Sequence, residues 1–246
     1  MEILVCIDDT DNLESRGTGK LAAILCDHLE NNHWGVCRPI TRHQMLVHPD
    51  IPYTSHNSAM CFVAEIGPQF LSPFTDFAQS FLVRESAPGS DPGLCIVRID
   101  HLDDPDSLIE FGRITKTSVV TKDDAYKLAA HLKVHLSEHG GTGQGVIGAI
   151  AGCGLRLSGN DGRFRGHFKI DADCLRVDEF IRQTGCNVVM SLNGYVLRDD
   201  ETVRIGEKVK SVLKENKAIQ LVYAQPDEQT GETFWRTCTK EQLRVF

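Results

Sequence analysis

Three carboxylates lie within four residues near the start of the chain, directly after an apolar run. Asp8, Asp9 and Asp11 follow residues 3–7, which read Ile-Leu-Val-Cys-Ile. The run favours a buried strand whose end presents the carboxylates together, and carboxylate oxygens bind hard cations such as Mg²⁺. Because Asp and Thr also favour turns and helix caps, a solvated turn is the alternative reading.

A glycine-flanked threonine and a lysine follow this cluster and precede a helical pattern. Apolar residues at helical spacing predict an amphipathic helix over about 18–31. Free N–H groups at a glycine-rich helix start bind phosphate. We therefore expect a Mg–nucleotide site with Asp8, Asp9 and Asp11 as metal ligands. Gly17 and Gly19 would supply backbone donors, Lys20 a nearby cation and Thr18 a hydroxyl.

A second glycine-rich segment spans residues 140–148 and includes Gly141, Gly143, Gly145 and Gly148. Its last three glycines match the dinucleotide-binding fingerprint as a string, but that motif needs a strand before it. A helix is predicted there, over about 123–138, so we do not expect a Rossmann fold. Two readings remain, phosphate contact through backbone N–H groups or tight helix packing that small residues allow.

Two groups of histidines could also carry function. His131, His135 and His139 are spaced four apart on the predicted 123–138 helix, and histidines at that spacing can chelate zinc. A metal-dependent hydrolase is therefore one alternative, and a solvated stripe of the helix is the other. In the irregular segment 43–57, His56 and Asn57 are candidates for substrate contact or for hydrogen bonds that fix the loop.

Composition limits the class of protein. The chain has 246 residues, 41% of them hydrophobic, and a formal net charge of −8, which argues against a surface coated with basic residues. Nine cysteines without any C-x-x-C pair give no support for a zinc ribbon and point to a reducing compartment. With no long apolar span and no signal-peptide pattern, we expect a cytoplasmic protein.

The hydrophobic pattern predicts a mixed fold whose character changes after about residue 160. Further strands are expected over 60–66 and 94–99, an extended segment over 116–121 and a short helix over 177–183. Asn193-Gly194 signals a hairpin turn. Short strands are then expected at 203–205, 218–224, 233–239 and 243–246.

Four segments resemble, in order, those of the archaeal tRNA(Ile) 2-agmatinylcytidine synthetase family. They are Val5-Cys6-Ile7-Asp8-Asp9-Thr10-Asp11, Pro49-Asp50-Ile51-Pro52-Tyr53-Thr54-Ser55-His56-Asn57, Pro92-Gly93-Leu94-Cys95-Ile96-Val97 and Gly143-Gln144-Gly145-Val146-Ile147-Gly148-Ala149. The resemblance covers roughly residues 1–155. Because the segments occur together and in order, they are more specific than any one motif alone.

The resemblance implies an enzyme that uses ATP and Mg²⁺ to activate the C2 oxygen of a tRNA cytidine, which agmatine then displaces. It implies a kinase-like nucleotide-binding domain interrupted by a ferredoxin-like domain, followed by an OB-fold and a zinc ribbon. By motif position, Asp8, Asp9 and Asp11 would bind metal and phosphate, and Thr18 would be the threonine that the family phosphorylates. Gly143, Gly145 and Gly148 would lie against the nucleotide.

Some residues depart from the family pattern. The threonine pair reads Thr18-Gly19 here, so Thr18 could instead serve as a helix cap. Residues 160–246 contain no cysteine pairs for a zinc ribbon. Together with the net charge, this disfavours tRNA, and we expect a small-molecule amine or a nucleoside-type substrate.

These observations lead to an expected α+β fold with three parts. A nucleotide-binding domain would span 1–57 with 140–160, a ferredoxin-like domain 58–139, and a β-rich C-terminal module 161–246. The expected function is an ATP- and Mg²⁺-dependent, ligase- or kinase-like enzyme that activates a carbonyl oxygen by phosphoryl transfer for amine attack. The alternative is a non-catalytic nucleotide-binding regulatory protein.

Overall fold

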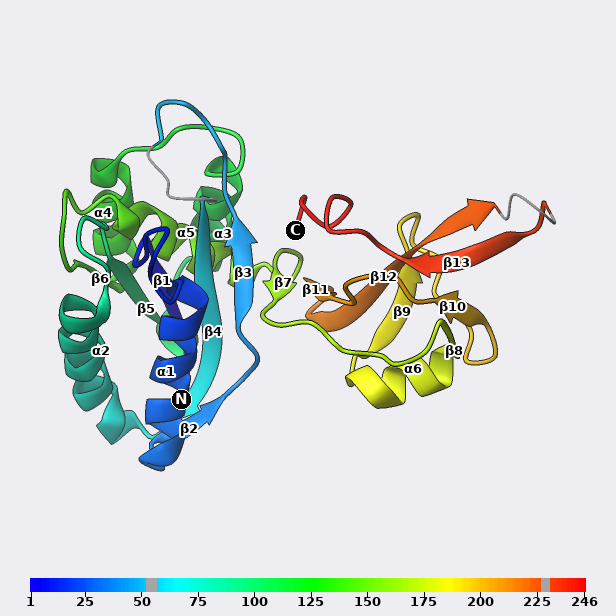
Figure 1. Ribbon diagram of the computed structural model, residues 1–246. Helices are drawn as coiled ribbons and strands as arrows, with labels where there is room; N and C mark the ends of the chain where they lie inside the picture. The colour runs from blue at the N-terminus through cyan, green and yellow to red at the C-terminus, as the bar shows by residue number, and fades with distance from the viewer. Residues whose placement is uncertain (52–56, 227–230) are drawn as a thin grey trace. The chain divides into compact units, whose positions relative to one another are not determined.

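The computed structural model describes residues 1–51, 57–226 and 231–246, and they form two compact units, Met1–Ser158 and Gly159–Phe246 (Figure 1). The division lies close to the expected start of the C-terminal module at residue 161. The finer division of the first unit, into 1–57 with 140–160 and 58–139, stays a prediction. One sheet contains strands from both of these segments, because β1 (Glu2–Asp8) lies between β4 (Ser58–Ile66) and β5 (Gly93–Arg98).

The sheet of the first unit is antiparallel throughout. Its strands lie in the order β6 (His135–Glu138), β5, β1, β4, β3 (Thr41–Gln44). The short strand β2 (Gly35–Cys37) pairs with the other end of β4. Because β1 is central, the residues at its end are surrounded by other elements.

Helices cover both faces of this sheet (Figure 1). On one face, α1 (Thr18–Asn31) and α2 (Leu71–Glu85) pack on Ile3, Val5 and Ile7. On the other, α3 (Pro105–Ile114), α4 (Lys122–Leu132) and α5 (Gly145–Leu157) enclose Leu4 and Cys6. Burial on both sides explains why β1 is apolar without alternation. Two short 3₁₀ helices, η1 (Pro68–Phe70) and η2 (Ile99–His101), complete the unit.

Helix α5 lies directly on β1 because glycines face the strand. An added Cβ at Gly148 would come within 1.7 Å of a carboxylate oxygen of Asp8, and one at Gly152 within 2.4 Å of Cys6 Sγ. Asp8 and Cys6 share one face of β1, and Gly148 and Gly152 are one helical turn apart. The close contact of α5 and β1 therefore depends on residues without side chains.

The expected helix over 123–138 is wrong in its second half. Helix α4 ends at Leu132, Lys133 adopts a left-handed backbone with φ of 54°, and β6 begins at His135. The leucines at helical spacing misled the prediction, because residues 134–139 also alternate as a strand does. The segment before the glycine-rich turn is thus a strand, and His131, His135 and His139 do not share a helix face.

The second unit is rich in short strands. Its sheet order is β7, β11, β12, β13, β10, β8, with β9 also paired to β12. Helix α6 contributes Phe180 to a core that also contains Val203 and Val222. Residues 243–246 form a turn rather than the expected strand. The bounds are β7 Arg163–Phe164, β8 Cys174–Arg176, α6 Val177–Thr184, β9 Val188–Ser191, β10 Thr202–Arg204, β11 Ser211–Lys214, β12 Lys217–Pro226 and β13 Thr233–Thr237.

The chain is therefore a mixed α/β protein with mostly antiparallel strands. Among the residues that the structure describes, no helix combines the length and apolar character needed to cross a membrane.

Candidate active site

A cavity of about 280 Å³ opens in the first unit, where the end of β1 meets the starts of α1 and α5. The segment before α4 and the first residue of that helix form another wall. Of the residues singled out from the sequence, Asp8, Asp9, Asp11, Thr18, Asn57, Gly145 and Gly148 line this cavity. The other lining residues are Met45, Asp50, Ile51, Ser58, Thr115, Ser118, Val119, Val120, Thr121, Lys122, Gln144 and Ile147.

Asp8 is the most buried of the carboxylates, with 8% of its surface exposed. It ends β1 on the face toward α5, and the missing side chain of Gly148 leaves the space that its carboxylate occupies. Burial, followed by the charge of Asp9, raises the pKa of Asp8 to about 8. The carboxyl group therefore holds a proton near neutral pH unless a cation offsets its charge.

Asp9 has a left-handed backbone with φ of 48°, which is uncommon outside glycine and costs conformational energy. Burial and the charges of Asp91 and Asp11 raise its pKa to about 6. Four carboxylates thus act on one another here: Asp8 ends β1, Asp9 and Asp11 follow that strand, and Asp91 lies in the loop before β5. The first three line the cavity. A bound hard divalent cation would relieve the repulsion between these carboxylates, because carboxylate oxygens are its preferred ligands.

Thr18 is buried at the first turn of α1. Its backbone N–H donates to Asp11 Oδ2 at 3.3 Å, and its hydroxyl accepts a hydrogen bond from the Thr10 hydroxyl at 3.1 Å. Gly17 occupies the N-cap position with φ of 82°, and no side chain caps the helix there. Thr18 is therefore not the helix cap, and it is one of the residues that line the cavity.

The turn before α5 is occupied by acidic side chains of the protein itself. Asp91 accepts hydrogen bonds from the Thr142 backbone N–H and hydroxyl. The Glu138 carboxylate fills the space that a side chain at Gly143 would need. Gly141 and Gly143 lie outside the cavity lining, so this turn positions the start of α5, whereas Gly145 and Gly148 reach the cavity.

A lysine lines the cavity, although it is not the expected one. Lys20 is exposed and, like Gly17 and Gly19, is absent from the lining. Lys122, the first residue of α4, lines the cavity, and its Nζ donates to the Thr142 carbonyl at 2.9 Å and to Glu138 Oε2 at 3.1 Å. The capping box at Thr121 marks the start of α4 in the sequence, and Lys122 is the first residue of that helix.

Asn57 reaches the cavity but already serves the backbone of the adjacent segment. Its side-chain amide donates to the Leu46 carbonyl at 2.7 Å, and its backbone carbonyl oxygen accepts from the Met45 N–H at 2.9 Å. These bonds match the loop-fixing alternative given above. His56, the other substrate candidate, lies outside the described residues.

The histidines considered for a zinc hydrolase have separate partners. His131 lies 3.6 Å from Asp104. His135 and His139 both share hydrogen bonds with the Ser137 hydroxyl, at 2.9 and 2.8 Å. All three lie outside the cavity lining, so they add nothing to the carboxylate site.

No family model and no curated protein matches this sequence. Solved structures do match it. A complex of TiaS with an isoleucine tRNA and ATP aligns with a TM-score of 0.54 at 19% identity, covering 80% of this chain and 48% of that chain. A complex of TiaS with an isoleucine tRNA, AMPCPP and agmatine aligns with a TM-score of 0.53 at 18% identity, covering 80% and 49%.

A tRNA fluorescent labeling enzyme aligns over more of the molecule. Its TM-score is 0.54 at 17% identity, and the match covers 98% of this chain and 70% of that chain. The chain spans about half the length of the TiaS chains. At these identities the similarity concerns the fold, and the fold of this protein is similar to that of TiaS, a tRNA agmatidine synthetase.

Proposed function

We propose that this protein is an ATP- and Mg²⁺-dependent enzyme that activates a carbonyl oxygen by phosphoryl transfer so that an amine can displace it. One observation carries the proposal: the carboxylates at the end of β1 and the first turns of α1 and α5 line one cavity. Carboxylates suit a metal ion, and helix starts suit phosphate oxygens. A metal-bound triphosphate has the charges that this combination recognises.

In this proposal Asp8, Asp9 and Asp11 hold Mg²⁺. When bound, the cation neutralises charge on the triphosphate and so lowers the barrier to phosphoryl transfer. The positive ends of the α1 and α5 helix dipoles and the ammonium of Lys122 would attract the phosphate oxygens. The backbone N–H groups of Thr18 and Gly145 already donate to Asp11 and to the Asp91 carbonyl. The Thr18 hydroxyl lies among these groups, where it can contact a phosphate oxygen or accept a phosphoryl group.

The reaction has two bond exchanges. The acceptor carbonyl oxygen bonds to a phosphorus of ATP while the bond from that phosphorus to its bridging oxygen breaks. The amine nitrogen then bonds to the activated carbon, and the oxygen leaves with the phosphoryl group. The protein must exclude water during both exchanges, and the apolar side chains of Met45, Ile51 and Ile147 line the cavity beside the carboxylates.

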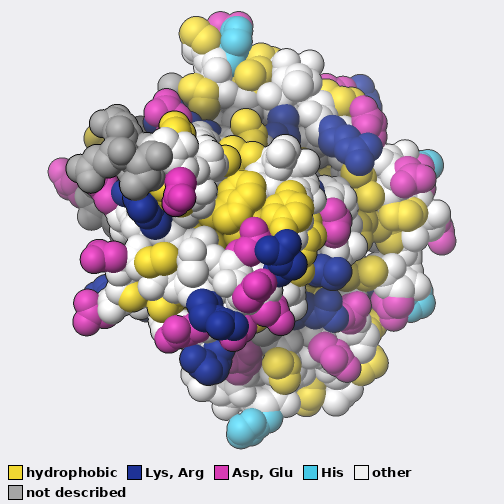
Figure 2. Space-filling model, turned by 90° about the vertical axis from the view of Figure 1, so that its right-hand side faces the viewer, with side chains coloured by type: hydrophobic (Ala, Val, Ile, Leu, Met, Phe, Trp, Pro, Cys, Tyr) yellow, Lys and Arg dark blue, Asp and Glu magenta, His cyan; other side chains and the backbone are white. Residues whose placement is uncertain are grey.

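The acceptor in this proposal is a nucleobase. Two of the similar structures contain tRNA, and one also contains agmatine, so our expectation against tRNA finds no support there. The second unit offers aromatic rings: Tyr195 stacks on Trp235 with centroids 5.9 Å apart, and the Arg204 guanidinium lies 3.5 Å from the Phe234 centroid. Aromatic and arginine side chains stack on unpaired RNA bases. Figure 2 shows hydrophobic side chains gathered beside basic and acidic ones on one face.

The test measures ATP consumption with agmatine and a tRNA transcript, each omitted in turn. We expect turnover that needs Mg²⁺, and a loss on the order of 1000-fold in Asp8→Asn and Asp9→Asn, because both remove a metal-binding charge. Asp27→Asn, an exposed change on α1, is the matched control and should be neutral. Nucleotide binding without turnover under any condition would favour the regulatory alternative, and unchanged turnover in both site variants would refute the assignment.

A further inference from the structure

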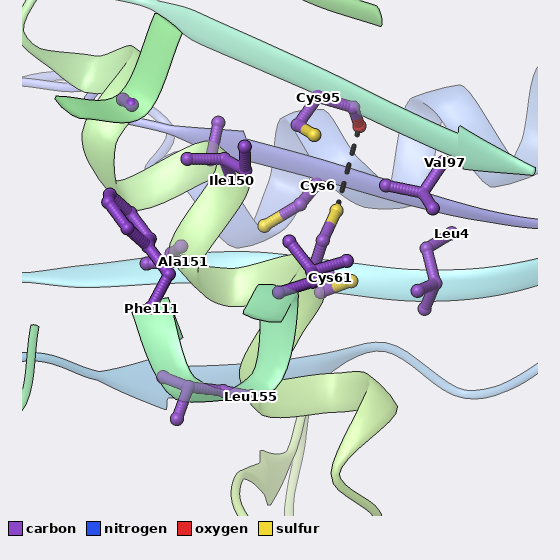
Figure 3. Packing of buried hydrophobic residues seen from close by; sticks show 14 of the residues in the cluster. Leu4, Cys6, Cys61, Cys95, Val97, Phe111, Ile150, Ala151 and Leu155 are labelled. Atoms are coloured by element: carbon purple, nitrogen blue, oxygen red, sulfur yellow. Dashed lines mark hydrogen bonds between the residues drawn. The ribbon is translucent and has the colours of Figure 1, made fainter. Parts of the chain in front are cut away.

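Four buried cysteines lie close together between helix α5 and the sheet, each on a different element. Cys6 on β1 is the register partner of both Cys61 on β4 and Cys95 on β5, so these three thiols form a row across adjacent strands. Cys153 reaches the same place from α5, and all four residues are fully buried. Figure 3 shows Cys6, Cys61 and Cys95 among apolar side chains. The Cys153 Sγ donates to the Cys95 carbonyl at 3.9 Å.

Three of the sulfur atoms have the spacing of metal ligands. The Sγ atoms of Cys6, Cys61 and Cys153 all lie within 4.8 Å of one another. The centre of such a triangle is at most about 2.8 Å from each corner, and a Zn–S bond is about 2.3 Å long. A shift of about half an ångström per sulfur would complete the bonds, which a change in side-chain torsion can supply.

The same place holds a buried cation. Arg156 of α5 is 8% exposed, and its Nη1 donates to the Thr41 hydroxyl at 3.1 Å. Thr41 is the register partner of Cys61 on the neighbouring strand. A guanidinium in an apolar interior favours negative charge beside it.

We propose that Cys6, Cys61 and Cys153 form a buried site for a thiophilic cation of the Zn²⁺ class. Binding forms three metal–sulfur bonds and releases the thiol protons to solvent. Three thiolates and Zn²⁺ leave one net negative charge, and the Arg156 guanidinium offsets it. Structural zinc sites are almost always four-coordinate, and the group of sulfur atoms within 4.8 Å of one another supplies three of the four ligands.

Such a site would join the elements that position the cavity. Cys6 lies two residues before Asp8 on β1, and Cys153 lies on the helix that carries Gly148. A bond from β1 to α5 through a metal ion would hold the contact that shapes the carboxylate site. The inference concerns metal content and does not depend on the proposed reaction, so either can fail alone.

The test uses the full chain, purified under reducing conditions without chelators and titrated with Zn²⁺ alone. We expect one zinc per chain by elemental analysis and a higher thermal midpoint with zinc. Cys61→Ala and Cys153→Ala should each weaken zinc binding on the order of 100-fold, measured by competition with a chelating dye. Cys238→Ala, which removes a buried thiol in the second unit, is the matched control and should retain the zinc.

If an alanine variant does not fold, Cys61→Ser keeps a side chain of similar size and serves in its place. Co²⁺ added to the unmutated protein gives a second readout, because thiolate ligands produce a strong near-ultraviolet absorption. Zinc binding that is absent, or equal in every variant, would overturn the proposal, as would missing cobalt absorption. A disulfide between Cys6 and Cys61 in the native protein would also overturn it and would assign the cluster to redox chemistry.

Discussion

The two helix starts at the cavity both carry glycine, but for different physical reasons. At α1, Gly17 has φ of 82°, and an added Cβ would lie an ordinary 3.6 Å from the nearest atom, Asp11 Oδ2. At α5, an added Cβ on Gly148 would lie 1.7 Å from Asp8 Oδ2. The first glycine supplies a backbone conformation, and the second supplies space for a carboxylate.

The difference teaches how each helix start serves the site. The start of α1 is tied to Asp11 through the Thr18 N–H, so it is oriented by a hydrogen bond. At the start of α5, the backbone of Gly148 packs directly against the Asp8 carboxylate. This contact contributes to the burial that raises the pKa of Asp8. Changes at α5 should therefore disturb both packing and electrostatics, whereas changes at α1 should disturb mainly local geometry.

The largest effect should come from Gly148→Ala. The added methyl group collides with the Asp8 carboxylate, so we expect a loss of about 1–3 kcal/mol in the free energy of unfolding and loss of Mg–nucleotide binding. Urea unfolding and nucleotide titration measure the two effects. Because Asp8→Ala removes the colliding group, the double variant Gly148→Ala/Asp8→Ala should recover stability but not binding. Failure to recover would contradict the contact as the cause.

The pH dependence of the free energy of unfolding tests whether the Asp8 carboxyl group is as buried as the contact with α5 implies. The pKa of Asp8 is about 8 in the folded protein, because of burial and then the charge of Asp9, against an ordinary value of 3.8. Between these values the folded state keeps a proton that the unfolded state has lost. This contribution to stability is therefore present at low pH and lost as pH rises toward 8.

Asp8→Asn should flatten that slope, and Mg²⁺ should raise the thermal midpoint of the unmutated protein more at pH 8 than at pH 6. Thermal unfolding with and without Mg²⁺ at several pH values measures both. The account of Asp8 would be contradicted by a magnesium effect that does not grow with pH.

Lys122 at the start of α4 and Lys20 in the first turn of α1 should differ in their effect on nucleotide binding. Lys122→Gln removes a cation from the cavity wall and should weaken nucleotide binding about tenfold, the worth of a charge-assisted hydrogen bond. Lys20→Gln changes an exposed residue outside the lining and should weaken it less than about twofold. Titration with a non-hydrolysable nucleotide measures both, and equal losses would contradict the assignment of Lys122.

The smallest effect should come from Gly17→Ala. A side chain in this backbone conformation should cost about 1 kcal/mol of stability and weaken nucleotide binding by a few-fold. Gly89 has φ of 83°, nothing within 4 Å of its added Cβ, and no part in the cavity lining, so Gly89→Ala is the control. It should lower stability similarly and leave binding unchanged; a similar loss of binding in both would show that the α1 start is not special.

Segments with a strong local pattern were predictable from the sequence. The run at residues 3–7 is apolar on both faces and became most of the central strand β1, and the helix over 18–31 matches α1. The carboxylates of Asp8, Asp9 and Asp11 could be grouped because they are adjacent in the chain. The cavity also brings Gly145 and Gly148 to them, as the sequence suggested.

Features that depend on tertiary contacts were not predictable in the same way. Residues 134–138 fit a helix or a strand, and pairing with β5 decides for the strand. Lys122 borders the cavity because Glu138 and Thr142 hold its ammonium. No local pattern indicated that β1 would lie between β4 and β5, because strand pairing depends on residues far apart in the chain.

The most direct test of the central claim is a crystal soaked with Mg²⁺ and a non-hydrolysable ATP analogue. The account predicts density for the cation beside Asp8, Asp9 and Asp11, with the phosphates between the first turns of α1 and α5. Triphosphate density away from these carboxylates, or an empty cavity at saturating nucleotide, would contradict it.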